Sequence, residues 1–482
     1  MERQARITEG DPAILELAGI GVPCDKTDSS DRSDSATYAD PMRMVPSPTA
    51  RVLAIALATF LAATMMTAGP AAASTPQTPG NFTGYGFDAC GAPTQKVMDA
   101  WNLKSPYSAI GIYISGNSRY CGNKYQPNLS RAWVQANANN GWRFMPIHVG
   151  YQAPCFKNNP NSRVQKKRMS TTVGTARKQA RSDATESLAA ATTYGFGKGS
   201  VLYLDIEWYS RSNAACDNVT LEFIDAWTEK LRSAGYKSGL YSSGSAAIAS
   251  VNDARLNHRA GFTFPDHMWI AWTNRVANSD GGPYLSDSVW TNHQRIHQYH
   301  NGVNVRYGGY TLNIDKNFLD VGKGSVRVAE PKPCGVAMSF TSYANLKVGS
   351  KGAQVAALQC ILRQLGYKKS ITSVFGTGTR DGVNKFRKLH GWAQNGAVNG
   401  VVWTSLLAVG GKPRVMKYGS GDQAVWRLQR ALVAAGKKVT INGLYGSATV
   451  NAVQAYRTKN KLPSYPTTEA SVWSLLSRGM PG

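Results

Sequence analysis

Two carboxyl groups lie near the end of Val201–Trp208, a run whose β-branched, aromatic and leucine side chains predict a β-strand. Strand side chains alternate between two faces, which puts four apolar residues on one face: Leu202, Leu204, Ile206 and Trp208. Asp205 and Glu207 therefore share the other face. Unpaired carboxyl groups on a buried face are costly, and proteins keep them mostly where acid–base chemistry needs them. This strand is the first candidate for a catalytic site.

Two further aspartates follow the same alternation. Asp88 ends an apolar run with Tyr85 and Phe87 on the opposite face, and Asp315 alternates with apolar neighbours in the last such run. A structural alternative for the strand carboxyl groups is an ion pair, although no predicted strand offers an obvious inward Arg or Lys. For Asp315 the alternative is to anchor the barrel floor or a backbone amide.

The elements that position these side chains alternate along the chain. Helical stretches are predicted at Leu129–Asn139, Thr171–Tyr194 and Thr220–Ala234, whereas the last connections are rich in Gly, Asn, Ser and Asp. The strands are predicted at Tyr85–Asp88, Ala109–Ser115, Arg143–Val149, Val201–Trp208, Ser238–Ser242, Met268–Thr273, Arg295–Tyr299 and Thr311–Phe318. Eight strands with intervening helices indicate an α/β fold, a (β/α)8-type barrel with degenerate last helices. Active sites of such barrels lie at the C-terminal ends of the strands.

Several strand segments carry a resemblance to a known family. The segments are Tyr85–Cys90, Tyr203–Glu207, Trp269–Trp272, His297–Tyr299 and Ile314–Asn317. They resemble the glycoside-hydrolase-like domain of secreted actinobacterial proteins, which is similar in turn to the family-25 lysozymes. The resemblance spans residues 81–320 and implies a catalytic set of Asp88, Asp205 and Glu207.

The resemblance implies hydrolysis of the β-1,4 bond after N-acetylmuramic acid. Glu207 is expected to act as general acid on the leaving oxygen. Asp205 would hold the acetamido group or stabilise the oxocarbenium-like transition state, and Asp88 would complete the carboxylate set. Retention or inversion depends on the separation of the carboxyl groups.

Candidate substrate contacts come from other strands. They are Tyr113, His148, Tyr241, Trp272, Gln298 and Asp315. Flat aromatic faces suit C–H-rich pyranose rings, although aromatic residues in barrels more often serve packing. The histidines at 148, 293, 297 and 300 occur on different strands and in different alternation, so we expect neither a metal site nor a cofactor.

The C-terminal part is one sequence written twice. Leu346–Ser350 returns as Met416–Ser420, and matched apolar, Gln, Gly and Arg positions continue to Trp403 and Trp473, always 70 residues apart. Each copy predicts amphipathic helices and resembles the small three-helix peptidoglycan-binding domain of bacterial wall hydrolases. Packing alone could explain almost any single matched position.

The N-terminal part predicts export. Arg43 and Arg51 precede a short apolar core, and Ala71–Ala73 follow it, which is typical of a signal peptide. We expect the following division: 1–41, a disordered extension or misassigned start; 42–73, signal peptide; 81–321, barrel; 322–337, linker; 338–410 and 411–482, two all-α three-helix modules.

Charge and cysteines agree with a cell-wall location. The net charge is +25, and residues 338–482 hold 20 Lys and Arg against 3 Asp and Glu, a net of +17. Such a surface fits anionic wall polymers better than nucleic acid, because no nucleic-acid fold is predicted. Beyond the signal peptide six cysteines remain, an even number that predicts disulfides. We expect Cys334 to pair with Cys360, and three pairings remain open for Cys90, Cys121, Cys155 and Cys216.

The sequence therefore predicts a secreted, lysozyme-like peptidoglycan hydrolase, monomeric and without a membrane span after processing. The alternative is a non-catalytic wall protein whose barrel binds glycan without cleaving it, because fold does not decide function. A third interpretation is a hydrolase of another bacterial or fungal glycan, with the modules serving as tethers.

Overall fold

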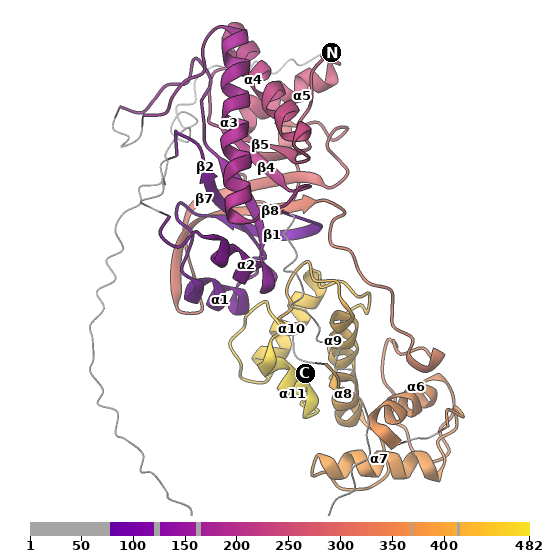
Figure 1. Cartoon of the computed structure of the whole chain (residues 1–482). Coiled ribbons are helices and arrows are strands. Elements are labelled where there is room, and N and C mark those ends of the chain that lie inside the picture. Colours follow the sequence, from indigo (N-terminus) through magenta and orange to yellow (C-terminus); the bar gives the residue numbers. More distant parts are fainter. Residues whose placement is uncertain (1–77, 120–125, 161–164, 368–369, 412–414) are drawn as a thin grey trace, which may run out of the picture. The chain divides into compact units, whose positions relative to one another are not determined.

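The computed structural model describes residues 78–119, 126–160, 165–367, 370–411 and 415–482 (Figure 1). The predicted N-terminal extension and signal peptide, residues 1–73, lie outside the described residues, as do Cys24 and Cys121. Within the described part of the chain, no helix is long and apolar enough to cross a membrane.

The predicted α/β barrel is confirmed, with one strand in an unexpected direction. The strands are β1 (Phe82–Asp88), β2 (Ala109–Ser115), β3 (Arg143–His148), β4 (Val201–Ile206), β5 (Lys237–Ser243), β6 (His267–Ala271), β7 (Gln294–Tyr307) and β8 (Tyr310–Val321). They close into one barrel in sequence order. Strands β1 to β7 run parallel to one another, but β8 is antiparallel to both of its neighbours, β7 and β1.

The direction of β8 follows from the turn that precedes it. Tyr307 pairs with Tyr310 across Gly308 and Gly309, whose φ angles are 58° and 92°. Two consecutive positive φ values make the tight hairpin turn that glycine favours. A hairpin needs no crossover helix, which explains why the last connection carries no helical signal.

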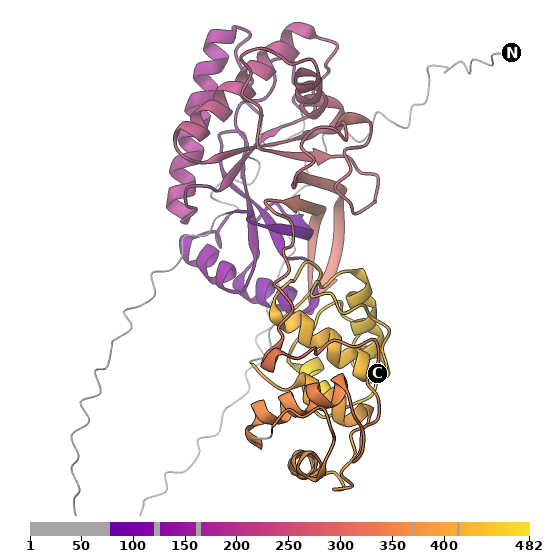
Figure 2. The ribbon, with the colours of Figure 1, turned by 90° about the vertical axis from the view of Figure 1, so that its right-hand side faces the viewer.

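Helices cover the early strands. They are α1 (Gln95–Lys104), α2 (Arg131–Asn139), α3 (Val173–Tyr194), α4 (Ala214–Ser233) and α5 (Ala249–Leu256). The predicted helices correspond to α2, α3 and α4, whereas α1 and α5 were not predicted. In Figure 2 the long helix α3 (magenta) runs along the barrel on the side away from β7 and β8.

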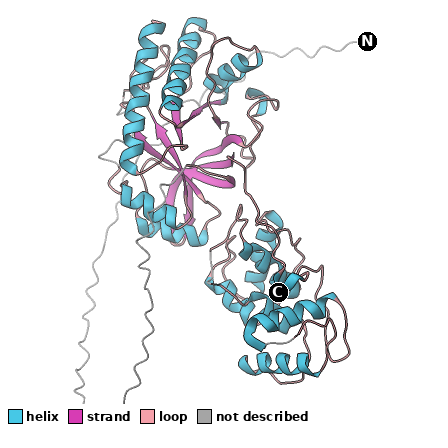
Figure 3. Cartoon of the chain, turned by 45° about the vertical axis from the view of Figure 1, so that its right-hand side comes forward, coloured by secondary structure: helices cyan, strands magenta, loops and turns pink. Residues whose placement is uncertain are grey.

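The strands separate two apolar cores. Figure 3 shows the strands surrounded by helices over much of the barrel. The outer core contains Leu202, Leu204 and Ile206 from β4, which pack against the helical layer. The inner core fills the barrel with side chains of the opposite alternation, including Val201 and Tyr203. This arrangement confirms the predicted apolar face of β4 and leaves the inner face to Asp205.

Three short helices form each half of the C-terminal region. They are α6 (Ala353–Leu362), α7 (Thr377–Leu389) and α8 (Gly400–Ala408), then α9 (Gln423–Ala434), α10 (Ser447–Lys459) and α11 (Ala470–Ser477). The second set starts 70 residues after the first at every helix, as the repeat predicts. Their buried apolar residues form one continuous cluster through both halves.

A buried glutamine organises each repeat. The Gln359 carbonyl oxygen accepts hydrogen bonds from Thr372 N and Ser373 N at 2.9 and 3.0 Å, and its amide donates to Thr379 Oγ1 at 3.0 Å. Gln429 makes the equivalent contacts 70 residues later, with Asn442, Gly443 and Thr449. These repeated positions fix the loop between two helices, so their match between copies has a structural reason.

One helix position holds the preceding linker in both repeats. In the first, Cys360 forms the predicted disulfide with Cys334. In the second, Arg430 takes the equivalent place, and its guanidinium pairs with Glu330 at 3.0 Å and donates to Ser339 Oγ at 3.0 Å. The predicted linker is therefore fastened at two points by different chemistry.

The barrel also contains disulfides. Cys155 pairs with Cys216 across Cα atoms 5.9 Å apart, which joins the segment after β3 to the start of α4. Cys90 is disulfide-bonded as well. Of the three pairings that the sequence left open, the structure selects the one that contains Cys155–Cys216.

Candidate active site

The two carboxyl groups of the DIE sequence occupy different environments. Asp205 points into the barrel from β4 and is 4% exposed, and its Oδ1 has no hydrogen-bond partner in the described structure. Glu207 follows the last residue of β4, and its side chain is 32% exposed. The sequence predicted one shared buried face. The strand ends at Ile206, so Glu207 instead lies at the barrel mouth.

Asp88 joins this site from β1. It is 2% exposed, and its Oδ2 accepts hydrogen bonds from Asn317 Nδ2 at 2.7 Å and Gln298 Nε2 at 3.2 Å. In the barrel register, Asp88 lies opposite Asp315 of β8 and Gly111 of β2. A Cβ on Gly111 would lie 2.5 Å from the Asp88 Cβ, so glycine makes room for this carboxyl group.

The carboxylate site consists of Asp88, Asp205, Glu207 and Asp315. Burial raises the pKa of Asp88 well above its usual range, and the charges of Asp315 and Asp205 raise it further. Burial also raises the pKa of Asp205, as does the charge of Glu207. Burial and Glu207 raise the pKa of Asp315 to about 6. The pKa of each of the three aspartates is therefore raised in part by the charge of another carboxyl group of the site.

Protonation of Asp315 should stabilise the barrel. Its pKa is about 6 in the folded chain and 3.8 as the ordinary value, so the folded state binds this proton more tightly. The contribution is present below the ordinary pKa and is lost as the pH rises through the folded pKa. We expect D315N to raise the melting temperature relative to the parent at pH 7, with a smaller difference at pH 4.

Thermal unfolding of the two proteins at several pH values measures this effect. Asp287, whose side chain is 91% exposed, offers a matched control as D287N. A D315N difference that stays constant from pH 4 to 7 would contradict the raised pKa of Asp315.

Two tyrosines and a glutamine line the same site. The charges of Asp88 and Asp205 add to the effect of burial in raising the pKa of both Tyr113 and Tyr241. Tyr241 Oη donates to Gln298 Oε1 at 3.0 Å, so Gln298 connects this tyrosine to Asp88. These predicted substrate contacts therefore lie with the carboxylate site.

His148 lies elsewhere. It ends β3 on the outer face, where it is fully buried and its ring lies against Trp227 of α4. Its Nδ1 is 2.8 Å from Ser115 Oγ, and its Nε2 is 3.3 Å from Asp183 Oδ2 of α3. His148 therefore lies between β3 and the helices α3 and α4, and not at the carboxylate site where a substrate contact was predicted.

Trp272 also falls outside the carboxylate site. It follows β6 with outward alternation and stacks on His297, with ring centroids 5.6 Å apart. Its edge meets Tyr284, and its ring lies against Gly282. The observed contacts of Trp272 are therefore packing contacts.

Sequence reasoning missed two residues that hold the end of β4. Gln152 Nε2 donates to the Asp205 carbonyl at 2.9 Å, and its Oε1 accepts from Glu207 N at 2.7 Å. Lys166 forms an ion pair with the Glu207 carboxylate. A basic partner of Glu207 was considered only on the predicted strands, whereas Lys166 lies in a loop. The only sign of this partner in the sequence was the basic run at 166–168.

The side chains that could hold a metal ion lie outside the carboxylate site. Among the described residues, His148, Asp183 and Glu186 are close enough to share an ion. Both carboxylates already accept backbone hydrogen bonds, Asp183 from Tyr151 N at 3.0 Å and Glu186 from Gly116 N at 2.9 Å. This cluster lies between the barrel wall and α3, apart from the carboxylate site.

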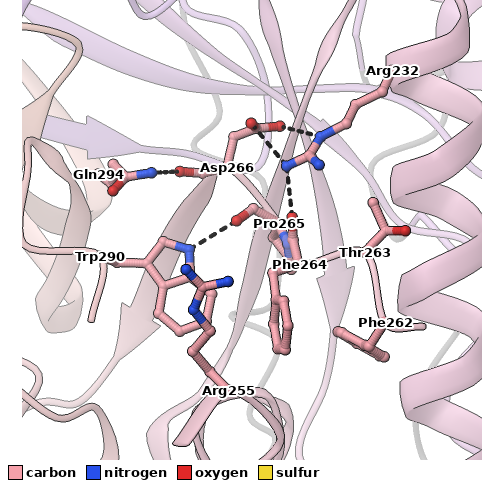
Figure 4. A pocket seen from close by; sticks show the side chains of 9 residues that line it. All are labelled: Arg232, Arg255, Phe262, Thr263, Phe264, Pro265, Asp266, Trp290 and Gln294. Atoms are coloured by element: carbon pink, nitrogen blue, oxygen red, sulfur yellow. Dashed lines mark hydrogen bonds and ion pairs between the residues drawn. The ribbon is translucent and has the colours of Figure 1, made fainter. Parts of the chain in front are cut away.

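A separate cavity of about 410 Å³ lies beside the start of β6 (Figure 4). Arg232 pairs there with Asp266 at 3.0 Å, and Trp290 Nε1 donates to the Pro265 carbonyl at 2.8 Å. Because β6 begins here, the cavity belongs to the strand end opposite the carboxylate site. Its main polar groups are paired with one another.

Family models match two parts of the chain. Residues 99–319 match the model described as "Rv2525c-like, glycoside hydrolase-like domain". Residues 351–406 match the model described as "Putative peptidoglycan binding domain". Among curated proteins, no match is found.

Solved structures are similar to about half of this chain. The Mycobacterium tuberculosis Tat-secreted protein Rv2525c is 12% identical, with a TM-score of 0.33, over 50% of this chain and 97% of that chain. A family 25 glycosyl hydrolase from Bacillus anthracis is 15% identical, with a TM-score of 0.30, over 50% and 91%. An uncharacterized B. stearothermophilus protein is 16% identical, with a TM-score of 0.34, over 49% and 95%.

Proposed function

We propose that this chain, which contains a glycoside hydrolase-like domain and a peptidoglycan-binding domain, is a secreted peptidoglycan hydrolase of the muramidase type. Its bond would be the β-1,4 linkage after N-acetylmuramic acid. The observation that carries this proposal is the carboxylate site, where buried and solvent-accessible carboxyl groups meet beside two tyrosines.

Glycoside hydrolysis needs one protonated and one ionised carboxyl group. Burial favours the protonated form of Asp205 and Asp88, because the pKa of each is raised. Glu207 instead forms an ion pair with Lys166 at the barrel mouth. We assign proton donation to the buried aspartates, with Asp205 adjacent to the mouth, and charge stabilisation to Glu207. The sequence-based hypothesis had given Glu207 the proton.

The substrate contacts of this proposal follow the geometry of the site. Tyr241 and Gln298 form a hydrogen-bonded pair beside Asp88, and Tyr113 shares their environment. Their hydroxyl and amide groups can bind sugar hydroxyls, while the tyrosine rings offer apolar faces. Asp315 would complete the polar lining.

The competing proposal is a non-catalytic glycan-binding barrel. The observation that favours it is pairing: Asp88 accepts two amide hydrogen bonds, and Glu207 has a lysine partner. Paired carboxylates can bind sugar hydroxyls without cleaving a bond.

Digestion of purified peptidoglycan separates the two proposals. The mature protein is incubated with purified peptidoglycan, and the soluble products are examined by mass spectrometry for new reducing ends. Muramidase action releases fragments that end in N-acetylmuramic acid. Sedimentation with peptidoglycan but no new reducing ends would support the binding protein instead.

A further inference from the structure

A short basic segment lies beside Glu207 of the carboxylate site. The basic strap, residues 165–169, is bound by the rest of the barrel through its backbone. The two backbone polar groups of Lys166 bond to the Asn158 side chain: its N–H donates to Oδ1 at 2.7 Å, and its carbonyl accepts from Nδ2 at 3.0 Å. Lys167 N donates to Ser118 Oγ at 3.0 Å.

The strap also pairs with Gln152. The Lys167 carbonyl accepts from Gln152 N at 2.8 Å, and Met169 N donates to the Gln152 carbonyl at 2.8 Å. The Gln152 side chain in turn bonds to the backbone of Asp205 and Glu207. One residue therefore connects the strap to the end of β4, so the strap and the carboxyl groups keep a fixed relation.

The side chain of Lys166 is directed into the site. It is 18% exposed, and its ammonium pairs with Glu207 and lies 5.9 Å from the centre of the Phe156 ring. Burial lowers the pKa of Lys166, but the charges of Glu207 and Asp205 outweigh burial and raise it overall. The side chain is therefore an ammonium ion, and its positive charge acts on Glu207 and Asp205.

We propose that Lys166 is a positioning residue of the carboxylate site, which holds the side chain of Glu207 in place at the barrel mouth. The proposal rests on the proposed hydrolase function. The five backbone hydrogen bonds of the strap favour a permanent part of the site over a lid that opens.

Replacement of Lys166 tests this proposal in the full mature chain. We expect K166M to reduce peptidoglycan cleavage by about tenfold or more, because a misplaced catalytic group loses rate steeply. K166R keeps the charge and should restore most of the activity. K167M is the matched control, because the neighbouring Lys167 side chain is exposed. The pH–rate profile should change shape in K166M and remain unchanged in K167M.

A second measurement does not depend on cleavage. Lys166 lowers the pKa of Asp205 against the effect of burial. Carbon-13 NMR titration of the aspartate carboxyl groups should therefore show a higher pKa for Asp205 in K166M, with D205N identifying the signal. If K166M does not fold, K166Q serves in its place.

Each outcome bears on one proposal. An unchanged Asp205 titration in K166M overturns the positioning role, whether or not the protein cleaves glycan. Faster cleavage by K166M than by the parent also overturns it, in favour of a blocking lysine. A shifted titration in a parent protein that releases no reducing ends keeps the role of Lys166 and refutes the hydrolase.

Discussion

Replacing Glu207 by glutamine should reduce glycan cleavage by about 100-fold or more, the usual effect of losing an acid–base or charge-stabilising group. Glutamine keeps the shape of the side chain and can still accept a hydrogen bond from Lys166, but it has no negative charge. Glu207 is partly exposed and lies beyond the strand, so we expect the fold to persist. The measurement is the rate of reducing-end release from purified peptidoglycan.

Glu229 provides the control for this substitution. It pairs with Arg177 at 2.9 Å and its side chain is 45% exposed, so E229Q removes a glutamate from an ion pair outside the site. E229Q should cleave glycan like the parent. If E207Q retains full activity, the essential carboxyl group is another one. If E207Q unfolds, the ion pair with Lys166 is structural.

The C-terminal repeats should be sufficient for wall binding. We expect residues 335–482 to sediment with purified peptidoglycan at low salt and to be released in large part at high salt. Residues 338–482 carry 20 basic and 3 acidic side chains, and salt screens the attraction of exposed charges. The measurement is the fraction of protein in the pellet at salt concentrations from about 0.05 to 1 M. At about 1 M salt the Debye length is only about 3 Å, so most of the attraction between exposed charges is screened.

The barrel alone, residues 78–321, is the companion sample for this measurement. If the barrel sediments with peptidoglycan and the repeat fragment stays soluble, wall binding belongs to the barrel and the prediction is wrong. Binding of the repeats that does not respond to salt would indicate recognition through uncharged groups instead.

The barrel could be predicted because two patterns in the sequence agree: side chains alternate within each strand, and strands alternate with helices along the chain. Alternation in β4 separates Leu202 and Leu204 from Asp205, and the structure places them in the outer core and the barrel interior. The direction of β8 was not predicted, because the pattern of side chains in a strand is the same whether the strand runs parallel or antiparallel to its neighbours. The signal was local: Gly308 and Gly309 close a hairpin.

The site was predicted as far as strand alternation reaches. Asp88, Asp205 and Asp315 lie on strands, so their faces follow from the sequence. Glu207 lies one residue beyond its strand, where alternation no longer applies. Lys166 comes from a loop, and no periodicity relates a loop residue to a strand end. His148 shows the opposite failure, since its residue type suggested a ligand contact while its parity directs it outward.

The antiparallel β8 has a consequence for how the barrel can be joined to other sequences. Phe82 at the start of β1 pairs with Val321 at the end of β8, whereas Asp88 and Asp315 pair at the mouth. The chain therefore enters and leaves the barrel at one end, and the carboxylate site lies at the other. Segments can be added or exchanged before Phe82 or after Val321 without rebuilding the loops that hold the carboxyl groups. The two positions at which the barrel joins the rest of the chain, before Phe82 and after Val321, therefore lie next to each other.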